Sequence, residues 1–226
     1  MSEVPREEPG HEPVGEDDEA RGEGLGRILA LSDGVFAIAL TILVIEIALP
    51  AHVADEHLRG ALARLGPKYV AYVLSFLVIG RFWLAHHLAF RYIARFDGML
   101  LWLNLILLMM VAFLPFPTSV LGNYGNVPEA ALLYGAAAVL TSEASAALWW
   151  YASGRSRLLR PGTPPEVIRV ARARSVSGPI FFTCTLPVAA FAPFVAEGLW
   201  VFGFTLVRIL VARLARAERV RRASRS

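Results

Sequence analysis

The stretch from residue 27 to residue 50 constrains the fold most strongly, because it is apolar and long enough to cross a membrane yet carries an acid inside it. Asp33 lies about 9 Å beyond Arg27 along a helix that rises ~1.5 Å per residue. A carboxylate at that depth in a bilayer is costly and marks a functional site by default. After Asp33, the only polar side chains of the stretch are Thr41 and Glu46. We therefore expect this helix to line an ion pathway.

Further apolar blocks of similar length follow, and they determine the fold class. The chain is 56% hydrophobic, whereas soluble domains are about 45–50% apolar. A block of ~20 residues spans ~30 Å of hydrocarbon, and its backbone groups must be satisfied within the segment, so each span is a helix. The sequence predicts an all-α integral membrane protein with six transmembrane helices. The predicted spans are residues 27–49, 68–90, 98–121, 129–151, 176–196 and 198–215.

The two ends of the chain carry opposite charge. We assign residues 1–24 to a disordered acidic N-terminal tail, residues 25–215 to the six-helix transmembrane domain, and residues 216–226 to a basic C-terminal tail. In a membrane protein, a basic end favours the cytoplasmic face and anionic lipid over nucleic acid. The expected partners are the lipid bilayer and further copies of the chain, with no nucleic acid and no organic substrate.

Arginine and lysine residues in the short loops predict the orientation. If the N-terminus is inside, loops 91–97 and 152–175 face the cytoplasm and carry most of the loop arginines, whereas loop 122–128 faces outward and has none. This bias predicts that both termini are cytoplasmic and that the protein lies in the cytoplasmic membrane. Tryptophans such as Trp83 lie nearer the ends of spans than their centres, as interface anchors do.

Charged and polar residues of the first two spans form a candidate cluster. Arg27 and Asp33 are about 240° apart round a helix, so each needs a partner on another helix. Arg81, His86 and His87 of the second span lie at similar depth. We expect Asp33 to cluster with His86 or His87, with Arg81 as a further candidate. A structural clamp is favoured over a proton relay.

The sequence argues against enzyme chemistry. His86 and His87 are adjacent, about 100° apart on a helix, so they are poorly placed to bind one metal ion, and no H-E-x-x-H spacing occurs. The lone Cys184 excludes a thiol metal cluster. We expect no metal site and no cofactor. Asn104 is expected to form an interhelical hydrogen bond.

Two further acids, Glu46 and Glu143, allow alternative roles. Glu46 either attracts cations to the outer mouth or pairs with Lys68. Glu143 is expected to bond a neighbouring helix. A proton-coupled secondary transporter using Asp33 or Glu143 is the rival function; transporters of this kind show broken helices, which the prolines of span 176–196 would favour, and internal repeats, which are missing here.

An aliphatic stripe follows Asp33. Ile38, Thr41, Ile45 and Leu49 fall on one face of a helix, and Ile42 flanks it. Spacing alone favours packing, with a hydrophobic pore constriction as the alternative. The T-V-G-Y-G filter of ordinary potassium channels is missing, so any ion selectivity must come from side chains.

Three segments together resemble a known family. Residues 27–41, which read R-I-L-A-L-S-D-G-V-F-A-I-A-L-T, resemble the R-x-x-x-F-S-D signature of the transmembrane protein 175 family of potassium channels. Residues 82–87 (F-W-L-A-H-H) and 104–118 (N-L-I-L-L-M-M-V-A-F-L-P-F-P-T) support the match. Leu31 stands where the signature has Phe.

The resemblance implies a homotetramer of six-helix subunits in which the first helix lines a central pore. The pore is permeable to K⁺, the only expected ligand. The gate isoleucine of the family corresponds to Ile38, and its selectivity threonine to Thr41. Further apolar layers correspond to Ile42 and Ile45. By this resemblance the stripe lines the pore, and four copies around an axis supply the enclosure that one subunit lacks.

The resemblance also gives the polar motif a role. The motif residues Arg27, Ser32 and Asp33 belong to a network with polar groups on neighbouring helices, which matches the clamp with Arg81, His86 and His87. We expect this network to hold the apolar face of the first helix toward the axis.

Overall fold

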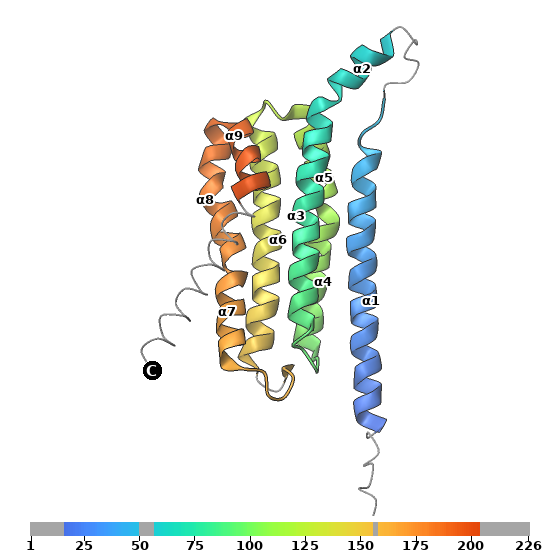
Figure 1. Ribbon diagram of the computed structural model, residues 1–226, viewed down its shortest axis with the longest axis vertical. Helices are drawn as coiled ribbons and strands as arrows, with labels where there is room; N and C mark the ends of the chain where they lie inside the picture. Colours follow the sequence, from blue (N-terminus) through green and yellow to red (C-terminus); the bar gives the residue numbers. More distant parts are fainter. Residues whose placement is uncertain (1–15, 50–56, 156–157, 204–226) are drawn as a thin grey trace, which may run out of the picture.

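The computed structural model describes residues 16–49, 57–155 and 158–203, and in these ranges the chain is a bundle of helices. The long helices run roughly along one common direction, with α1 at one edge (Figure 1). The helices in the described ranges are α1 (Glu16–Ile45), α2 (Leu58–Arg64), α3 (Gly66–Phe90), α4 (Gly98–Phe113), α5 (Pro115–Tyr124), α6 (Pro128–Gly154), α7 (Pro165–Ser175), α8 (Ser177–Phe191), α9 (Pro193–Gly198) and the π-helix η3 (Leu199–Gly203).

Four segments of the described chain are long and apolar enough to cross a membrane: Gly22–Ile45, Gly66–Phe90, Gly98–Tyr124 and Pro128–Gly154. They correspond to the first four predicted spans. The third contains both α4 and α5, because Pro115 has no N–H and interrupts the helical hydrogen bonds at Leu114. The amide of Leu114 bonds to the carbonyl of Val111 instead, and the helix then continues.

The second half of the chain differs more from expectation. Span 176–196 is divided into α8 and α9 at Ala192, which precedes Pro193 and lies outside the helical region at φ −145° and ψ 74°. Of span 198–215, only its first residues, up to Gly203, are described; the rest and the tail 216–226 lie outside the described residues. Loop 152–175 contains α7, a helix that hydropathy did not predict.

Helix α1 also differs at both ends. It begins at Glu16, so residues 16–24 are helical although the sequence assigned them to the disordered tail. Residues 1–15 lie outside the described residues. At the other end α1 stops at Ile45 instead of residue 49. The short helix α2 lies in the predicted outer loop 50–67 and was not predicted.

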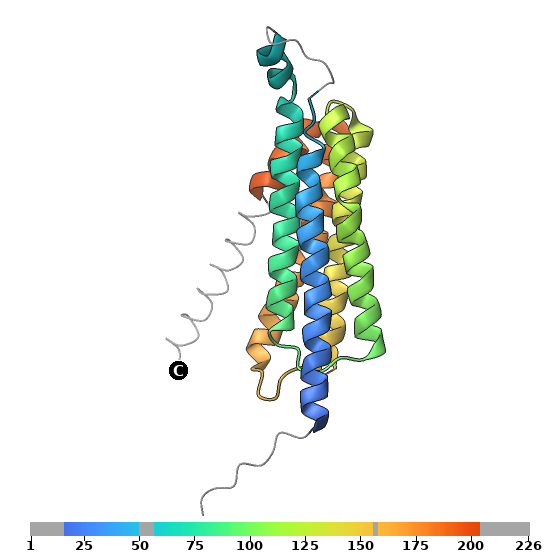
Figure 2. The ribbon, with the colours of Figure 1, turned by 90° about the vertical axis from the view of Figure 1, so that its right-hand side faces the viewer.

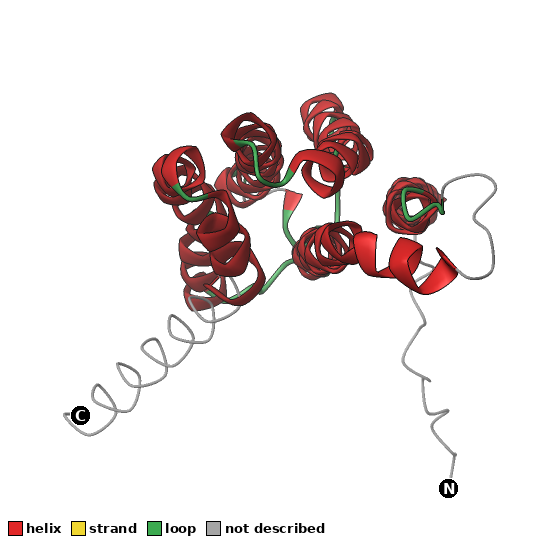
Figure 3. Ribbon diagram, turned by 90° about the horizontal axis from the view of Figure 1, so that it is seen from above, coloured by secondary structure: helices red, strands yellow, loops and turns green. Residues whose placement is uncertain are grey.

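Helix α1 packs on one side only. Its main contacts are with α3, α4 and α5, and Figures 2 and 3 show it on the outside of the bundle, apart from α6 and α8. Its buried side chains recur along a single stripe, as one helix face requires. They are Leu25, Ser32, Phe36, Ala39 and Leu43.

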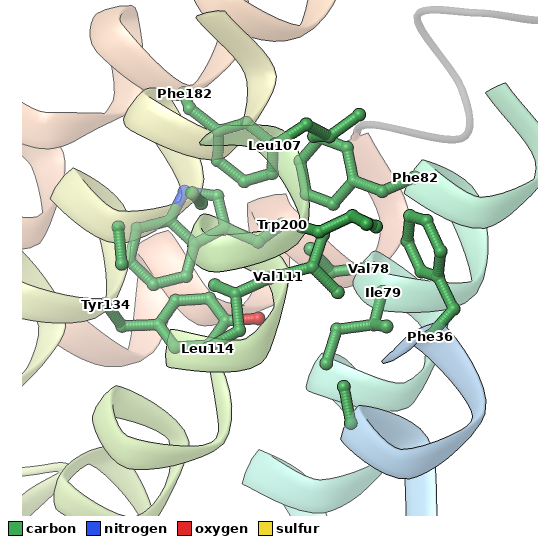
Figure 4. Packing of buried hydrophobic residues seen from close by; sticks show 14 of the residues in the cluster. Phe36, Val78, Ile79, Phe82, Leu107, Val111, Leu114, Tyr134, Phe182 and Trp200 are labelled. Carbon is green, nitrogen blue, oxygen red and sulfur yellow. The ribbon is translucent and has the colours of Figure 1, made fainter. Parts of the chain in front are cut away.

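The core runs through the whole bundle (Figure 4). Phe36 of α1 packs at one end of it, and Phe182 of α8 and Trp200 of η3 lie at the other. Hydrogen bonds between helices join the polar groups inside this core: Ser75 bonds with both Tyr134 and Thr118. Interhelical hydrogen bonds of this kind are common in membrane bundles, where lipid offers no polar partner. The core therefore fixes which side of α1 faces inward.

Candidate functional site

The aliphatic stripe of α1 faces away from the helices of its own chain. Ile38 is 59% exposed, Ile42 40% and Ile45 69%, and Thr41 is also exposed. The spacing alone favoured packing within the chain, but none of these four side chains is buried against the described helices. The stripe is thus available to line a pathway or an interface formed by further molecules.

Thr41 is the polar group of this face. Its hydroxyl donates a hydrogen bond of 2.9 Å to the backbone carbonyl of Ile38. Because the proton is used in that bond, the exposed group that remains is the hydroxyl oxygen with its lone pairs. An oxygen with this polarity is suited to meet a cation and unsuited to meet an anion.

A buried hydrogen-bond chain connects three helices behind the stripe. The Ser32 hydroxyl donates to the carbonyl of Ile28 at 2.8 Å and accepts from the Asn104 amide at 3.1 Å. The Asn104 oxygen lies 2.9 Å from His86 Nε2, so this nitrogen is the donor. Ser32, His86 and Asn104 are each at most 2% exposed. The chain joins α1 to α4 and α4 to α3, as expected for Asn104.

Asp33 has a different partner from the one that the sequence suggested. The indole Nε1 of Trp83 donates to Asp33 Oδ1 at 2.8 Å. His86 bonds with Asn104 instead, and the His87 ring lies beside Trp83 with 5.7 Å between ring centroids. The predicted cluster therefore forms on the expected helices, but Trp83 replaces a histidine as the hydrogen-bond donor to the acid.

Sequence reasoning treated Trp83 only as an interface anchor. The spacing in the sequence could have indicated this contact, because Trp83 lies three residues before His86 and so shares a face of α3 with it. The face of α3 that turns His86 into the bundle beside α1 therefore also brings the Trp83 indole within reach of Asp33.

The remaining predicted residues lie apart from this network or at its edge. Arg27 is exposed on α1. Arg81 is half-buried and lines a cavity between α3, α6 and α7. Glu46 accepts a hydrogen bond of 2.6 Å from Ser119 of α5 and shares a small hollow with Lys68. Glu143 is exposed on α6, facing away from the described helices of its chain.

Comparison with known proteins connects this arrangement to a family. A potassium channel from Streptomyces collinus is 40% identical over 168 residues, which cover 73% of this chain and 82% of that protein. The chain belongs to the TMEM175 family. The family model described as endosomal/lysosomal potassium channel TMEM175 matches residues 27–115, from Arg27 through α4. A potassium channel from Chamaesiphon minutus is 42% identical over 139 residues, covering 59% of this chain and 68% of that one.

Solved structures agree with this membership. The crystal structure of a lysosomal potassium-selective channel TMEM175 homolog from Chamaesiphon minutus matches with a TM-score of 0.72 and 28% identity, covering 84% of this chain and 98% of that chain. The TMEM175 family consists of channels and not of enzymes, so this chain is a multi-pass membrane channel protein. The enzyme reading of the histidine pair has no further support.

Proposed function

We propose that this TMEM175-family chain is a subunit of a homotetrameric, K⁺-permeable channel of the cytoplasmic membrane. The observation that carries the proposal is the stripe on α1, in which Ile38 and Ile45 are mostly exposed and face away from the described helices. The relatives from Streptomyces collinus and Chamaesiphon minutus are named potassium channels, which supports K⁺ as the permeant ion. No organic cofactor takes part.

Symmetry provides the pathway that one subunit lacks. Four copies of α1 around an axis turn the stripe into rings of side chains. Rings of isoleucine narrow a pore and gate it by excluding water. In this arrangement Ile38 is the gate, Ile42 and Ile45 form further apolar layers, and Thr41 presents its hydroxyl oxygen to the ion. Selectivity then arises from side chains, since the sequence lacks the T-V-G-Y-G motif of a carbonyl filter.

The remaining elements complete the membrane domain. Six spans per subunit require residues 176–196, which contain α8 and the start of α9, as the fifth span and residues 198–215 as the sixth. Both termini then lie in the cytoplasm, where the arginines of α7 are also placed. The acid Glu46 follows the end of α1 on the outer side, where it accepts a hydrogen bond from Ser119 of α5. The partners of each subunit are three further copies and the bilayer.

Recording from reconstituted protein tests the proposal. Purified full-length protein in planar bilayers with asymmetric K⁺ and Na⁺ should give currents that reverse toward the K⁺ equilibrium potential. Ile38→Asn makes the constriction polar and should raise the leak current and weaken discrimination against Na⁺. Ile180→Asn is the matched control, because Ile180 is also 59% exposed but lies on α8. Unchanged currents in Ile38→Asn, or equal changes in both variants, would contradict the gate assignment.

The rival function is a proton-coupled secondary transporter using Asp33 or Glu143. The break at Ala192 is the observation in its favour, since transporters contain interrupted helices. Asp33, however, is engaged by Trp83 beside the buried hydrogen-bond chain. Turnover separates the two readings: single-channel currents far above the transport rate of a carrier require a channel. Proton-driven uptake without such currents would favour the transporter.

A further inference from the structure

A cavity on the side of the bundle away from the α1 stripe has no role in the proposed conduction pathway. It has a volume of about 300 Å³ and lies between α3, α6, α7 and the start of α8. Among the described residues that line it, none belongs to α1. This volume is at the lower end of the range for small-molecule sites, about 300–1,000 Å³. It is large enough to hold a head group, with part of a longer molecule extending outside.

The charge of the lining favours an anion. Arg81 of α3 and Arg174 of α7 both line the cavity, and the described lining residues include no acid. The two arginines come from helices that are far apart in the sequence, so the fold brings two positive charges to one hollow. Guanidinium groups bind phosphate and carboxylate oxygens strongly, through several N–H donors at once.

Trp149 of α6 also lines the cavity and is only 4% exposed. Its indole Nε1 has no hydrogen-bond partner among the described residues, but this nitrogen is itself buried and is not exposed to the cavity. Trp149 therefore contributes the apolar surface of its ring to the wall.

Three serines of the cavity do not change its preference for an anion. The hydroxyls of Ser142, Ser175 and Ser177 each donate to a backbone carbonyl of their own helix region. The charged donors of the described lining are therefore the two arginines, beside the neutral hydroxyls of Tyr92 and Ser145. Much of the remaining wall is apolar and includes Phe82 and Leu88 of α3. A ligand that fits both parts is an amphiphile with an anionic head.

We propose that this cavity binds an anionic phospholipid, with its phosphate at Arg81 and Arg174 and an acyl chain along the apolar wall. Its origin in the inner leaflet rests on the proposed orientation, in which α7 lies on the cytoplasmic side. Residues 204–215, which lie outside the described ranges, are the competing occupant from the chain itself. That segment carries Arg208 and Arg213 and no acid, so it is basic like the lining of the cavity.

Binding of fluorescently labelled phosphatidylglycerol to purified full-length protein in a neutral detergent tests the assignment without using conduction. Arg174→Gln should weaken binding about fivefold or more, the effect of losing a charged hydrogen-bond partner. Arg169→Gln is the matched control: Arg169 lies on the same helix but lines a different surface, and binding should stay within about twofold.

Four results would overturn the proposal. Equal losses in Arg169→Gln and Arg174→Gln would mean unspecific attraction to a basic surface. Equal competition by phosphatidylcholine would show that the head-group charge is not recognised, and equal competition by soluble glycerol 3-phosphate would assign the site to a free anion. A disulfide between Ala85→Cys and Val207→Cys, in a Cys184→Ser background in native membranes, would place residues 204–215 in the cavity instead. Because Arg174 is exposed, its variant should fold, and the test does not depend on channel activity.

Discussion

The indole nitrogen of Trp83 donates a hydrogen bond of 2.8 Å to the carboxylate of Asp33, while the adjacent Ser32 accepts one of 3.1 Å from Asn104. Two neighbouring side chains of α1 are thus held by two different helices, α3 and α4. Such a pair fixes the rotation of α1 about its own axis. Thr41, nine residues after Ser32, lies about 180° round the helix from it. The polar network therefore turns the stripe of Ile38, Thr41 and Ile45 away from the bundle.

Removing either partner of the Asp33–Trp83 pair should destabilise the assembly. Asp33→Asn and Trp83→Phe should each lower the thermal unfolding midpoint in detergent and reduce the fraction of assembled oligomer on size exclusion. Because both remove the same hydrogen bond, their effects should not add, and a double-mutant cycle should give a coupling of about 1–2 kcal/mol. Trp102→Phe is the control, because Trp102 is 67% exposed on α4. Strict additivity would show that the bond does not clamp α1.

The buried chain through Asn104 should be more sensitive than a surface amide. Asn104→Leu leaves His86 Nε2 without its acceptor and Ser32 without its donor inside an apolar core. The expected cost is about 1–3 kcal/mol of unfolding free energy, measured by denaturation in mixed micelles. Asn123→Leu is the comparison, since Asn123 is exposed and bonds only to the carbonyl of Ser119 among the described residues. Similar losses in both variants would contradict a structural role for the chain.

The first four apolar spans could be predicted from the sequence, but the packing face of α1 could not. Phe36, Ala39 and Leu43 are buried, whereas Ile38 and Ile45 are exposed, and all are apolar. In a membrane protein, lipid and protein interior favour the same side chains, so hydropathy does not separate the two faces. The resemblance to a family of potassium channels suggested the pore face, and the burial pattern of α1 is compatible with it.

Other features could not be predicted from the sequence, each for a different reason. Helix α7 carries several arginines and is short, so its composition resembles a basic loop. The partner of Asp33 was predicted on the correct helix but with the wrong residue type, because Trp83 was interpreted only as an interface anchor and its indole N–H was not considered as a donor. The cavity formed by Arg81, Arg174 and Trp149 joins three segments, and no local pattern brings them together.

Thr41→Ala should separate selectivity from conduction. The substitution removes the hydroxyl oxygen from the proposed pore face, and the hydrogen bond that it removes is only local, to the carbonyl of Ile38. Current should persist. The K⁺/Na⁺ permeability ratio should fall about threefold or more, because the hydroxyl oxygen no longer replaces water around the K⁺ ion as it sheds its hydration shell. Reversal potentials in bi-ionic solutions measure this ratio. Thr183→Ala changes an exposed threonine on α8 and should leave the ratio unaltered.

Glu197 should make the stability of the protein depend on pH. It lies between the fifth and sixth predicted spans, is 9% exposed, and its Oε1 has no hydrogen-bond partner among the described residues. It lies beside Gly125 of the α5–α6 turn, where an added Cβ would be 3.4 Å from this oxygen. Burial raises the pKa of the Glu197 carboxyl from 4.5 to about 7.

A carboxyl whose pKa is higher in the folded state than in the unfolded chain binds its proton more tightly when folded. Its contribution to stability is therefore complete below pH 4.5 and is lost as the pH rises through about 7. The unfolding midpoint of the wild type should accordingly fall between pH 5 and pH 8. Glu197→Gln keeps the side chain neutral and should reduce this fall, so the variant should be the more stable protein at pH 8. Glu129→Gln alters an exposed acid near the same turn and should retain the pH dependence of the wild type. If both variants follow the wild-type curve, Glu197 is ionised throughout this range in the folded protein.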